Sequence, residues 1–234
     1  MYINFFLCYC SVLLYYFYYI KMKVLELFKG SGSITKFYEN NNDVEIISLD
    51  ILEKYNPSIV SDIMDFDYKQ FDIGYFDIIW ASPECKVFSN LQYTNIGRKW
   101  KDREELYDAQ KKDSKFINKT IEIIQYLKPK YYFIENPRYS KIWDFIENEN
   151  FKKDFVIVDY CAFGYNYKKP TKILTNKKLD NVLCKCNGNP KHPMRIGATS
   201  KEFFKLRPNI KIADNTTLLQ RYSIPEGLLK YLLL

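Results

Sequence analysis

Histidine is nearly absent from this sequence of 234 residues, in which the only one is His192, within the stretch NPKHP. Catalysis centred on histidine therefore has a single candidate, and we interpret His192 as a surface residue. The six cysteines are scattered and form no disulfide framework, which excludes a small scaffold stapled by disulfides. We expect reduced thiols in an intracellular protein.

Signatures of phosphate binding are missing as well. The sequence contains no G-x-G-x-x-G motif, and no glycine-rich loop ends in lysine followed by serine or threonine. A dinucleotide or a nucleoside triphosphate is therefore disfavoured as a ligand. There is also no internal repeat and no low-complexity linker, so the length is that of one domain with a sizeable core.

The charge is moderately positive, with 35 lysines and arginines against 28 acidic residues and a net charge of +7. A basic chain favours a polyanionic partner, and nucleic acid is the usual one. Solubility alone explains a charge of this size equally well. Apolar residues make up 47% and charged residues 27%, which is the composition of an ordinary globular protein.

Residues 1–21 form an apolar extension whose first twenty residues carry no charge. That length is just enough to cross a bilayer, so a membrane anchor is one reading. A signal peptide fits poorly, because a basic start and a cleavage site of small residues are lacking. We favour an extension without function upstream of the true start, because Met22 directly precedes a core strand. A membrane partner is expected only if residues 1–20 are an anchor.

From Met22 onward, apolar runs alternate with helical patterns. The expected strands span 23–28, 44–50, 75–82, 131–136, 155–160 and 171–176, and the expected helices span 34–41 and 102–127. Strands separated by helices predict an α/β fold with a doubly wound, mostly parallel, Rossmann-like sheet. We expect a catalytic domain over 22–176, an irregular segment over 177–217 and a closing helix over 218–234.

A glycine turn follows the first expected strand. Gly30 and Gly32 allow a sharp turn and close approach of a ligand, and the next helix is expected to point its N–H groups at that ligand. Asp50 ends the second strand, where a ribose-binding acid belongs, although a solvated aspartate is the alternative. Asp62 could accept from an adenine amino group, with Ile63 packing on the ring. Together these residues describe an adenosine-containing cofactor held without a phosphate grip, and S-adenosylmethionine fits that description.

Cys85 and Glu135 each follow a core strand. Because ligands bind beyond the carboxyl ends of parallel strands, both residues are expected at the same rim as the glycine turn. Most single cysteines are inert packing residues, but Cys85 lies in a polar turn that Pro83 stiffens. Lys86 would favour its thiolate, and Glu84 would oppose it.

Taken in order, the segments LELFKGSGS, SLD, SDI, ASPECKVFS and FIENP resemble the cytosine-5 DNA methyltransferases, and most closely the compact forms of phages and large DNA viruses. The resemblance runs from about Lys23 to Asn176. DYCAFGYNYKKPTKILTN and RYSIPEGLLKYLL are similar to the later part of those compact forms. Such a protein would act in the cytoplasm or the nucleus of a host cell.

The resemblance implies transfer of a methyl group from S-adenosylmethionine to carbon-5 of a flipped cytosine in DNA. Cys85 would be the nucleophile and Glu135 would contact the base. The residues implied in cofactor binding are Phe28, Gly30, Ser31, Gly32, Asp50, Asp62, Ile63 and Pro83. The residues implied in nucleic-acid binding are Lys86, Ser89, Asn136 and Lys168, with Asn136 expected to position its strand end rather than to react.

The sequence departs from the family in three places. Glu84 stands where proline usually precedes the cysteine, Lys86 replaces a common glutamine, and Lys168 would replace an arginine near the base. These departures keep open a catalytically impaired relative that binds nucleic acid. A cytosine-5 methyltransferase acting on RNA also stays open. Methylation at adenine N6 or cytosine N4 is disfavoured, because the matching loop reads SPEC and not Asp/Asn-Pro-Pro-aromatic.

Target choice would fall to residues 177–217, called the recognition segment below. Its Cys184, Cys186 and His192 lack the second half of a zinc motif, so we expect no metal. The segment is short, which predicts a small target site or little sequence preference. A basic cluster after the nucleophile could hold phosphates or could be a solvated face: Lys86, Arg98, Lys99, Lys101 and Arg103. We expect a monomer.

Overall fold

The computed structural model describes residues 21–165, 167–185, 194–195, 211–212 and 222–234. The apolar residues 1–20 and most of the recognition segment lie outside this part, so the predictions made for them are not addressed. None of the helices within the described ranges combines the length and the apolar character that crossing a bilayer requires.

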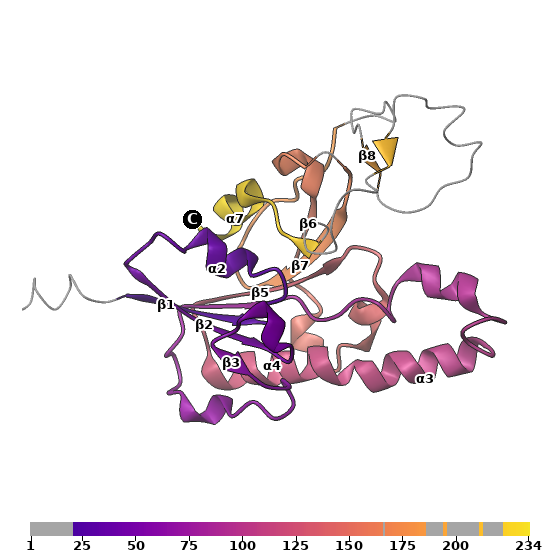
Figure 1. The fold of residues 1–234 in the computed structure, drawn as a ribbon, viewed down its shortest axis with the longest axis horizontal. Helices are drawn as coiled ribbons and strands as arrows, with labels where there is room; N and C mark the ends of the chain where they lie inside the picture. The colour runs from indigo at the N-terminus through magenta and orange to yellow at the C-terminus, as the bar shows by residue number, and fades with distance from the viewer. Residues whose placement is uncertain (1–20, 166, 186–193, 196–210, 213–221) are drawn as a thin grey trace, which may run out of the picture.

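Seven strands form one sheet in the order β3-β2-β1-β4-β5-β7-β6 (Figure 1). They are β1 (Met22–Leu27), β2 (Val44–Asp50), β3 (Ile59–Val60), β4 (Ile78–Ala81), β5 (Tyr131–Pro137), β6 (Phe155–Asp159) and β7 (Pro170–Thr175). All neighbouring strands are parallel except β7, which runs antiparallel to both β5 and β6. This arrangement confirms the predicted doubly wound, mostly parallel, Rossmann-like fold.

Alternating side chains of β1 face two separate hydrophobic layers, because successive residues of a strand point to opposite faces. Leu25 and Leu27 pack with the side chains of α4 (Lys115–Leu127), whereas Val24 packs with α2 (Ser33–Phe37) and α7 (Glu226–Leu233). Figure 1 shows α2 and α7 on one side of the sheet and α3 with α4 on the other. Both faces of the sheet are thus covered, which is why its strands read as continuous apolar runs.

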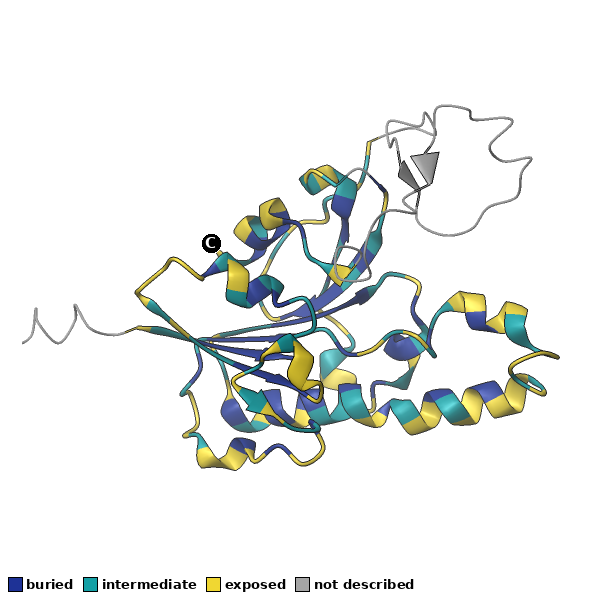
Figure 2. Cartoon of the chain, in the orientation of Figure 1, coloured by how far each residue is buried: buried dark blue, intermediate teal, exposed yellow. Residues whose placement is uncertain are grey.

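The helix expected over 102–127 is observed as two helices, α3 (Arg103–Asp113) and α4, which meet at Ser114. Asp102 caps α3 by accepting from the N–H of Glu105, and the chain leaves α4 at Lys128, before Pro129. In Figure 2, α4 turns a buried side to the sheet and an exposed side outward. Each fully buried isoleucine or leucine of α4 contributes roughly 2 kcal/mol by leaving water.

Short elements connect this frame. The 3₁₀ helices are η1 (Glu53–Tyr55), η2 (Tyr68–Gln70), η3 (Asn90–Asn95), η4 (Lys141–Phe145), η5 (Glu149–Phe151) and η6 (Tyr160–Phe163). Within the recognition segment, β8 (Met194–Arg195) and β9 (Lys211–Ile212) form a parallel pair.

The strand order reverses between β1 and β4, with β2 and β3 on one side and β5 on the other. At such a switch point the loops leave the carboxyl ends of neighbouring strands in opposite directions and open a crevice for a ligand. The glycine turn follows β1, the Cys85 loop follows β4, and Glu135 lies near the end of β5. The topology therefore brings the three predicted parts of the site to one rim.

Candidate active site

The turn after β1 has an unusual backbone. Phe28, Gly30 and Gly32 all have positive φ, of 56°, 47° and 65°. Glycine adopts this region without strain, whereas a phenylalanine there is uncommon and must be held by its surroundings. The N–H of Lys29 bonds to the carbonyl of Leu49 at 3.0 Å, and the N–H of Gly30 bonds to Oδ2 of Asp50 at 2.9 Å. The end of β2 therefore fixes the turn.

Glu26, on β1, controls the start of α2. Its side chain is 2% exposed and accepts the N–H of Ile34 at 3.0 Å and the N–H and hydroxyl of Thr35. Burial raises the pKa of this carboxyl, and the three donors oppose that rise. The prediction that these N–H groups point at a ligand is wrong, because a carboxylate of the protein already takes them.

Asp50 and Asp62, the two acids predicted to bind the cofactor, accept different numbers of hydrogen bonds from the protein. Asp50 accepts from Gly30 on one oxygen and from the N–H of Leu52 on the other, at 2.8 Å. Each carboxylate oxygen can accept a second hydrogen bond, so a ribose contact remains open. Asp62 accepts the N–H of Met64 at 2.9 Å, also through one oxygen.

The sequence analysis did not predict that an apolar side chain beside Asp50 belongs to the site. Ile63, expected to pack on a ring, is 3% exposed and lies in the hydrophobic core. Ile51 is 61% exposed and directly follows Asp50 at the rim. Ile51 is therefore the better candidate for contact with an aromatic ring. The sequence pattern that could have identified Ile51 is an apolar residue immediately after an acid that ends a strand.

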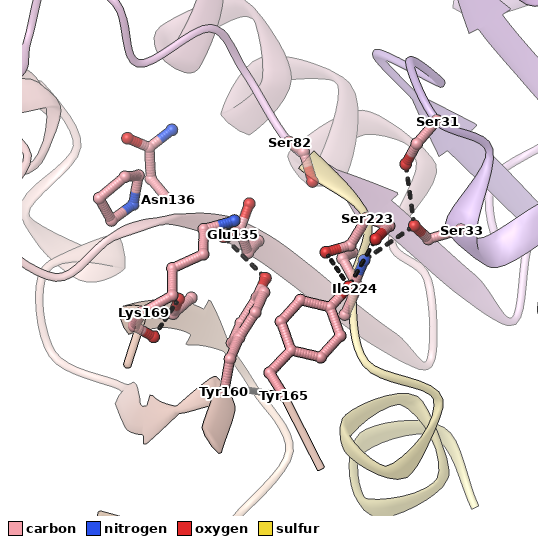
Figure 3. A network of polar contacts seen from close by, with 12 residues as sticks. Ser31, Ser33, Ser82, Glu135, Asn136, Tyr160, Tyr165, Lys169, Ser223 and Ile224 are labelled. Atoms are coloured by element: carbon pink, nitrogen blue, oxygen red, sulfur yellow. Dashed lines mark hydrogen bonds and ion pairs between the residues drawn. The ribbon is translucent and has the colours of Figure 1, made fainter. Parts of the chain in front are cut away.

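The C-terminal segment lies against the glycine turn. The N–H of Ile224 donates to Oγ of Ser33 at 3.0 Å, and Oγ of Ser33 lies 3.0 Å from Oγ of Ser31 (Figure 3). Sequence reasoning placed a closing helix on the catalytic domain, and the structure shows α7 packed there, but the serine contact was not anticipated. No residue pattern marked it, because the two partners are 191 positions apart.

This set of groups fits an adenosine-containing ligand without phosphates. It offers a carboxylate, hydroxyls and an exposed apolar side chain. At the N terminus of α2, Glu26 accepts the N–H groups of Ile34 and Thr35, which leaves these two groups unavailable to a phosphate. The two lysines beside the turn also donate to backbone carbonyls, Lys29 to Asn56 and Lys36 to Ser31.

The Cys85 loop leaves β4 and is tied to the end of β5. Asn136, 1% exposed, donates its side-chain amide to the carbonyl of Pro83 at 2.8 Å. Pro83 is itself buried, two residues before Cys85. This geometry supports the positioning role expected for Asn136 and leaves its expected contact with nucleic acid without support. It also makes Pro83 part of the nucleophile loop.

Glu135 is held from the side of the sheet opposite to α4. Its side chain is 7% exposed, and its Oε1 accepts the hydroxyl of Tyr160 at 3.0 Å (Figure 3). The ammonium of Lys169 lies 3.7 Å from the same oxygen. Carboxylate, phenol and ammonium thus form one cluster behind the rim.

Cys85 is a free, partly buried thiol within reach of this cluster. Burial raises its pKa above the usual range of a cysteine, and the Glu135 carboxylate adds to that rise. Lys169 opposes it, and the exposed Glu84 contributes least. The lysine that favours the thiolate is therefore Lys169 rather than the expected Lys86.

The adjacent lysines 168 and 169 have different positions. Lys168, which the sequence suggested as the cation near the base, lies 3.5 Å from the buried carboxylate of Asp159 and remains half exposed. Lys169 lies beside Glu135 and has the ring of Tyr160 beneath its ammonium at 4.5 Å. The structure thus brings Lys169, and not Lys168, next to Glu135, while the expected contact of Lys168 with nucleic acid stays a prediction.

The five cations of the basic cluster are all exposed and follow the nucleophile in the sequence. None of them forms an ion pair with another described residue. Ser89 caps η3 by accepting the N–H of Leu91, so its hydroxyl serves the loop in this structure. The arrangement leaves the cations available for phosphates.

The recognition segment begins beside β6. The N–H of Cys184 donates to Asp159 at 2.8 Å, and Val182 bridges to Val158. Cys85 and Cys161 are free thiols, as expected for them. Cys186 and His192 lie outside the described residues, among which no cluster of metal-ligating side chains occurs.

Comparison with known proteins gives one close relative by sequence. The chain is 31% identical over 159 residues to a probable DNA (cytosine-5)-methyltransferase of Frog virus 3 (isolate Goorha), covering 66% of this chain and 71% of the relative. No family model matches the chain.

Two solved structures are similar at low identity. A SAM-dependent methyltransferase from Archaeoglobus fulgidus is 16% identical with a TM-score of 0.33, over 54% of this chain and 51% of that one. An antibiotic-related methyltransferase is 10% identical with a TM-score of 0.40, over 68% and 88%. This chain thus spans about half the length of the archaeal protein, and no residue role follows from either likeness.

Proposed function

Since the chain belongs to the DNA (cytosine-5)-methyltransferase family, we propose that it methylates carbon-5 of cytosine in DNA through a covalent adduct on Cys85. The chain is a methyltransferase and its cofactor is S-adenosylmethionine, as the relative and the fold together imply. The observation that carries the proposal is the convergence of a thiol, a carboxylate and an ammonium at one rim: Cys85, Glu135 and Lys169.

The cofactor would be held by the glycine turn, Asp50, Asp62 and Ile51, and it supplies a methyl group on a sulfonium. Pro83 and Asn136 would serve that side of the site only indirectly, by placing the loop that carries Cys85. Ser31 offers its hydroxyl at the turn.

The protein residues would act on the base as follows. The Cys85 thiolate forms a bond to carbon-6 of cytosine, which gives carbon-5 the electron density to accept the methyl group. The Glu135 carboxylate accepts a hydrogen bond from the exocyclic amine, which holds the ring in place for the attack of Cys85. Loss of the carbon-5 proton then expels the thiolate and restores the ring. Lys169 offsets the negative charge of thiol and carboxylate in the same pocket.

A stacked base is out of reach of a buried carboxylate, so the cytosine must leave the duplex. The exposed cations that follow Cys85 would then hold the phosphates on either side, which positions the strand without reading its sequence. Sequence choice would rest with the recognition segment.

A second candidate is a relative that binds nucleic acid but transfers methyl groups slowly. The observation in its favour is the raised pKa of Cys85, which lowers the fraction of thiolate at neutral pH.

One experiment separates these functions. The full chain and Cys85→Ser are incubated with labelled S-adenosylmethionine and with DNA or RNA of mixed sequence. Label in DNA from the wild type alone, together with a covalent adduct on DNA containing 5-fluorocytosine, is the expected result. Label in RNA alone would move the substrate to RNA. Cofactor binding without label in either polymer would favour the second candidate.

A further inference from the structure

Tyr160 occupies the space directly behind Glu135. It is the first residue of η6, its side chain is 0% exposed, and its hydroxyl donates to Oε1 of Glu135 at 3.0 Å (Figure 3). A buried phenol that donates to a buried carboxylate both satisfies that carboxylate and restricts its rotation.

The phenol is the donor in this hydrogen bond, because a carboxylate oxygen accepts. Burial raises the pKa of Tyr160 well above its ordinary value, which favours the protonated phenol that this bond requires. The hydroxyl of Thr171, on β7, lies beside the phenol and donates to the carbonyl of Lys169 at 3.3 Å.

The contacts around Glu135 are one-sided. Tyr160 and Lys169 both meet Oε1, and no described residue is recorded as bonding to Oε2. Lys169 also lies 4.5 Å above the ring of Tyr160, which fixes the ammonium relative to the phenol. One oxygen of the carboxylate is thus anchored by the protein, and the other remains for a ligand.

We propose that Tyr160 is a positioning residue for the methylation reaction: it anchors Oε1 of Glu135 so that Oε2 faces the flipped cytosine. This rests on the proposed function, because it assigns the base to the side of Glu135 that the protein leaves free. Tyr160 does not touch the base itself. Its loss lets the carboxylate rotate away from the geometry in which Oε2 accepts from the exocyclic amine.

The test compares single-turnover methyl transfer to DNA by four full-length proteins: wild type, Tyr160→Phe, Glu135→Gln and the double variant. Tyr160→Phe is expected to slow transfer roughly 20-fold while the Kd for S-adenosylmethionine stays unchanged. If Tyr160 acts through Glu135, Tyr160→Phe slows the Glu135→Gln protein less than twofold. Equal losses in both backgrounds, or a wild-type rate for Tyr160→Phe, would overturn the inference.

Tyr38→Phe is the matched control. Tyr38 is a buried tyrosine of the same hydrophobic layer, and its hydroxyl has no hydrogen-bond partner among the described residues. We expect no change in its rate of transfer, and a loss equal to that of Tyr160→Phe would also overturn the inference.

Two further comparisons address a Tyr160→Phe protein that is unstable and a wild type that is inactive. If Tyr160→Phe melts below the assay temperature, Thr171→Val replaces it, since this change removes a hydroxyl that lies beside the phenol and that donates to the carbonyl of Lys169. It is expected to slow transfer about threefold, and an unchanged rate counts against the inference. Wild-type protein that methylates no cytosine overturns the proposed function and this inference together, whereas an active wild type and a Tyr160→Phe protein with the same rate overturn the inference alone.

Discussion

The turn after β1 and the loop after β4 leave the same rim of the sheet, but side chains of opposite character hold them. The turn exposes backbone N–H groups, and carboxylates take them: Glu26 accepts from the start of α2, and Asp50 accepts from Gly30. The loop exposes backbone carbonyls, and side-chain amides donate to them: Asn136 to Pro83, and Gln92 to Lys86.

The contrast has a physical reason. A turn with positive φ that enters a helix turns its N–H groups inward, so it needs buried acceptors. An irregular loop that ends in a 3₁₀ helix leaves carbonyls unpaired, so it needs donors without charge. Charged acceptors form stronger hydrogen bonds than neutral amides do. We therefore expect the cofactor side of the site to be the stiffer half and the nucleophile side to be the easier one to disturb selectively.

The largest effect should follow from removing Glu26. Glu26→Ala leaves two backbone N–H groups and a hydroxyl without their acceptor, and we expect the free energy of unfolding to fall by about 3 kcal/mol. The Kd for S-adenosylmethionine should rise roughly 100-fold, because the turn loses its shape. Urea denaturation measures the free energy of unfolding, and equilibrium binding measures the Kd for S-adenosylmethionine. Glu149→Ala, which breaks an exposed ion pair with Lys152, is the control and should change neither by more than a little. Cofactor affinity that survives Glu26→Ala would refute the stiff-turn interpretation.

Asn136→Ala should disturb the nucleophile side of the site and leave the cofactor side intact. It removes the amide that holds Pro83, so adduct formation with 5-fluorocytosine DNA should slow about 30-fold while cofactor affinity is kept. Asn176→Ala provides the control, since Asn176 donates a similar amide to the carbonyl of Lys130 and accepts the N–H of Tyr132 at the start of β5, the end opposite to Glu135. A parallel loss of cofactor affinity in Asn136→Ala would mean that the two halves are not separable.

Lys169→Met should lower the reactivity of Cys85. Burial and Glu135 already raise the pKa of this thiol, and Lys169 opposes the rise, so its removal moves the pKa higher still. Alkylation of Cys85 should rise with pH in the wild type until the raised pKa is passed, and the curve for Lys169→Met should lie at higher pH. At neutral pH we expect roughly 10-fold slower alkylation, because a smaller fraction of the thiol is ionised.

Lys168→Met is the control for that experiment, because Lys168 pairs with Asp159 and is not among the groups that act on the thiol. Its alkylation curve should coincide with that of the wild type. The reverse outcome, with Lys168 shifting the curve and Lys169 leaving it in place, would restore the assignment suggested by sequence.

Gln92→Ala should have the smallest effect. Gln92 donates to the carbonyl of Lys86 at 2.8 Å and accepts from the indole of Trp100 at 3.0 Å, so two neutral hydrogen bonds are lost from the loop. We expect adduct formation to slow roughly fivefold, in line with about 1 kcal/mol. A change of less than twofold would show that the loop does not depend on this amide.

Much of the fold could be predicted from the sequence. Apolar runs with helical segments between them were enough to predict the mostly parallel sheet. The positions of Asp50, Cys85 and Glu135 at strand ends predicted that they share one rim. The order of β6 and β7 could not be predicted, because a strand buried on both faces carries no mark of its direction. The break at Ser114 was missed because serine is not a strong helix breaker.

The candidate site was predictable only in part. The cofactor is confirmed, while the catalytic roles of Cys85 and Glu135 stay predictions. The structure differs from the prediction for three groups of the site. The N–H groups of α2 bond to Glu26, Ile63 lies in the core, and Lys169 rather than Lys168 lies next to Glu135. Each depends on which way a side chain points after the chain has packed.

The sequence by itself determined the element pattern, the residue types at each strand end and the resemblance to a methyltransferase family, because these depend on local periodicity and on spacing. Only the tertiary structure decided that Tyr160 anchors Glu135, that Asn136 holds Pro83 and that Ile224 reaches Ser33. These contacts join positions that are 25 to 191 residues apart. Their strength comes from burial and direction, which no spacing along the chain encodes.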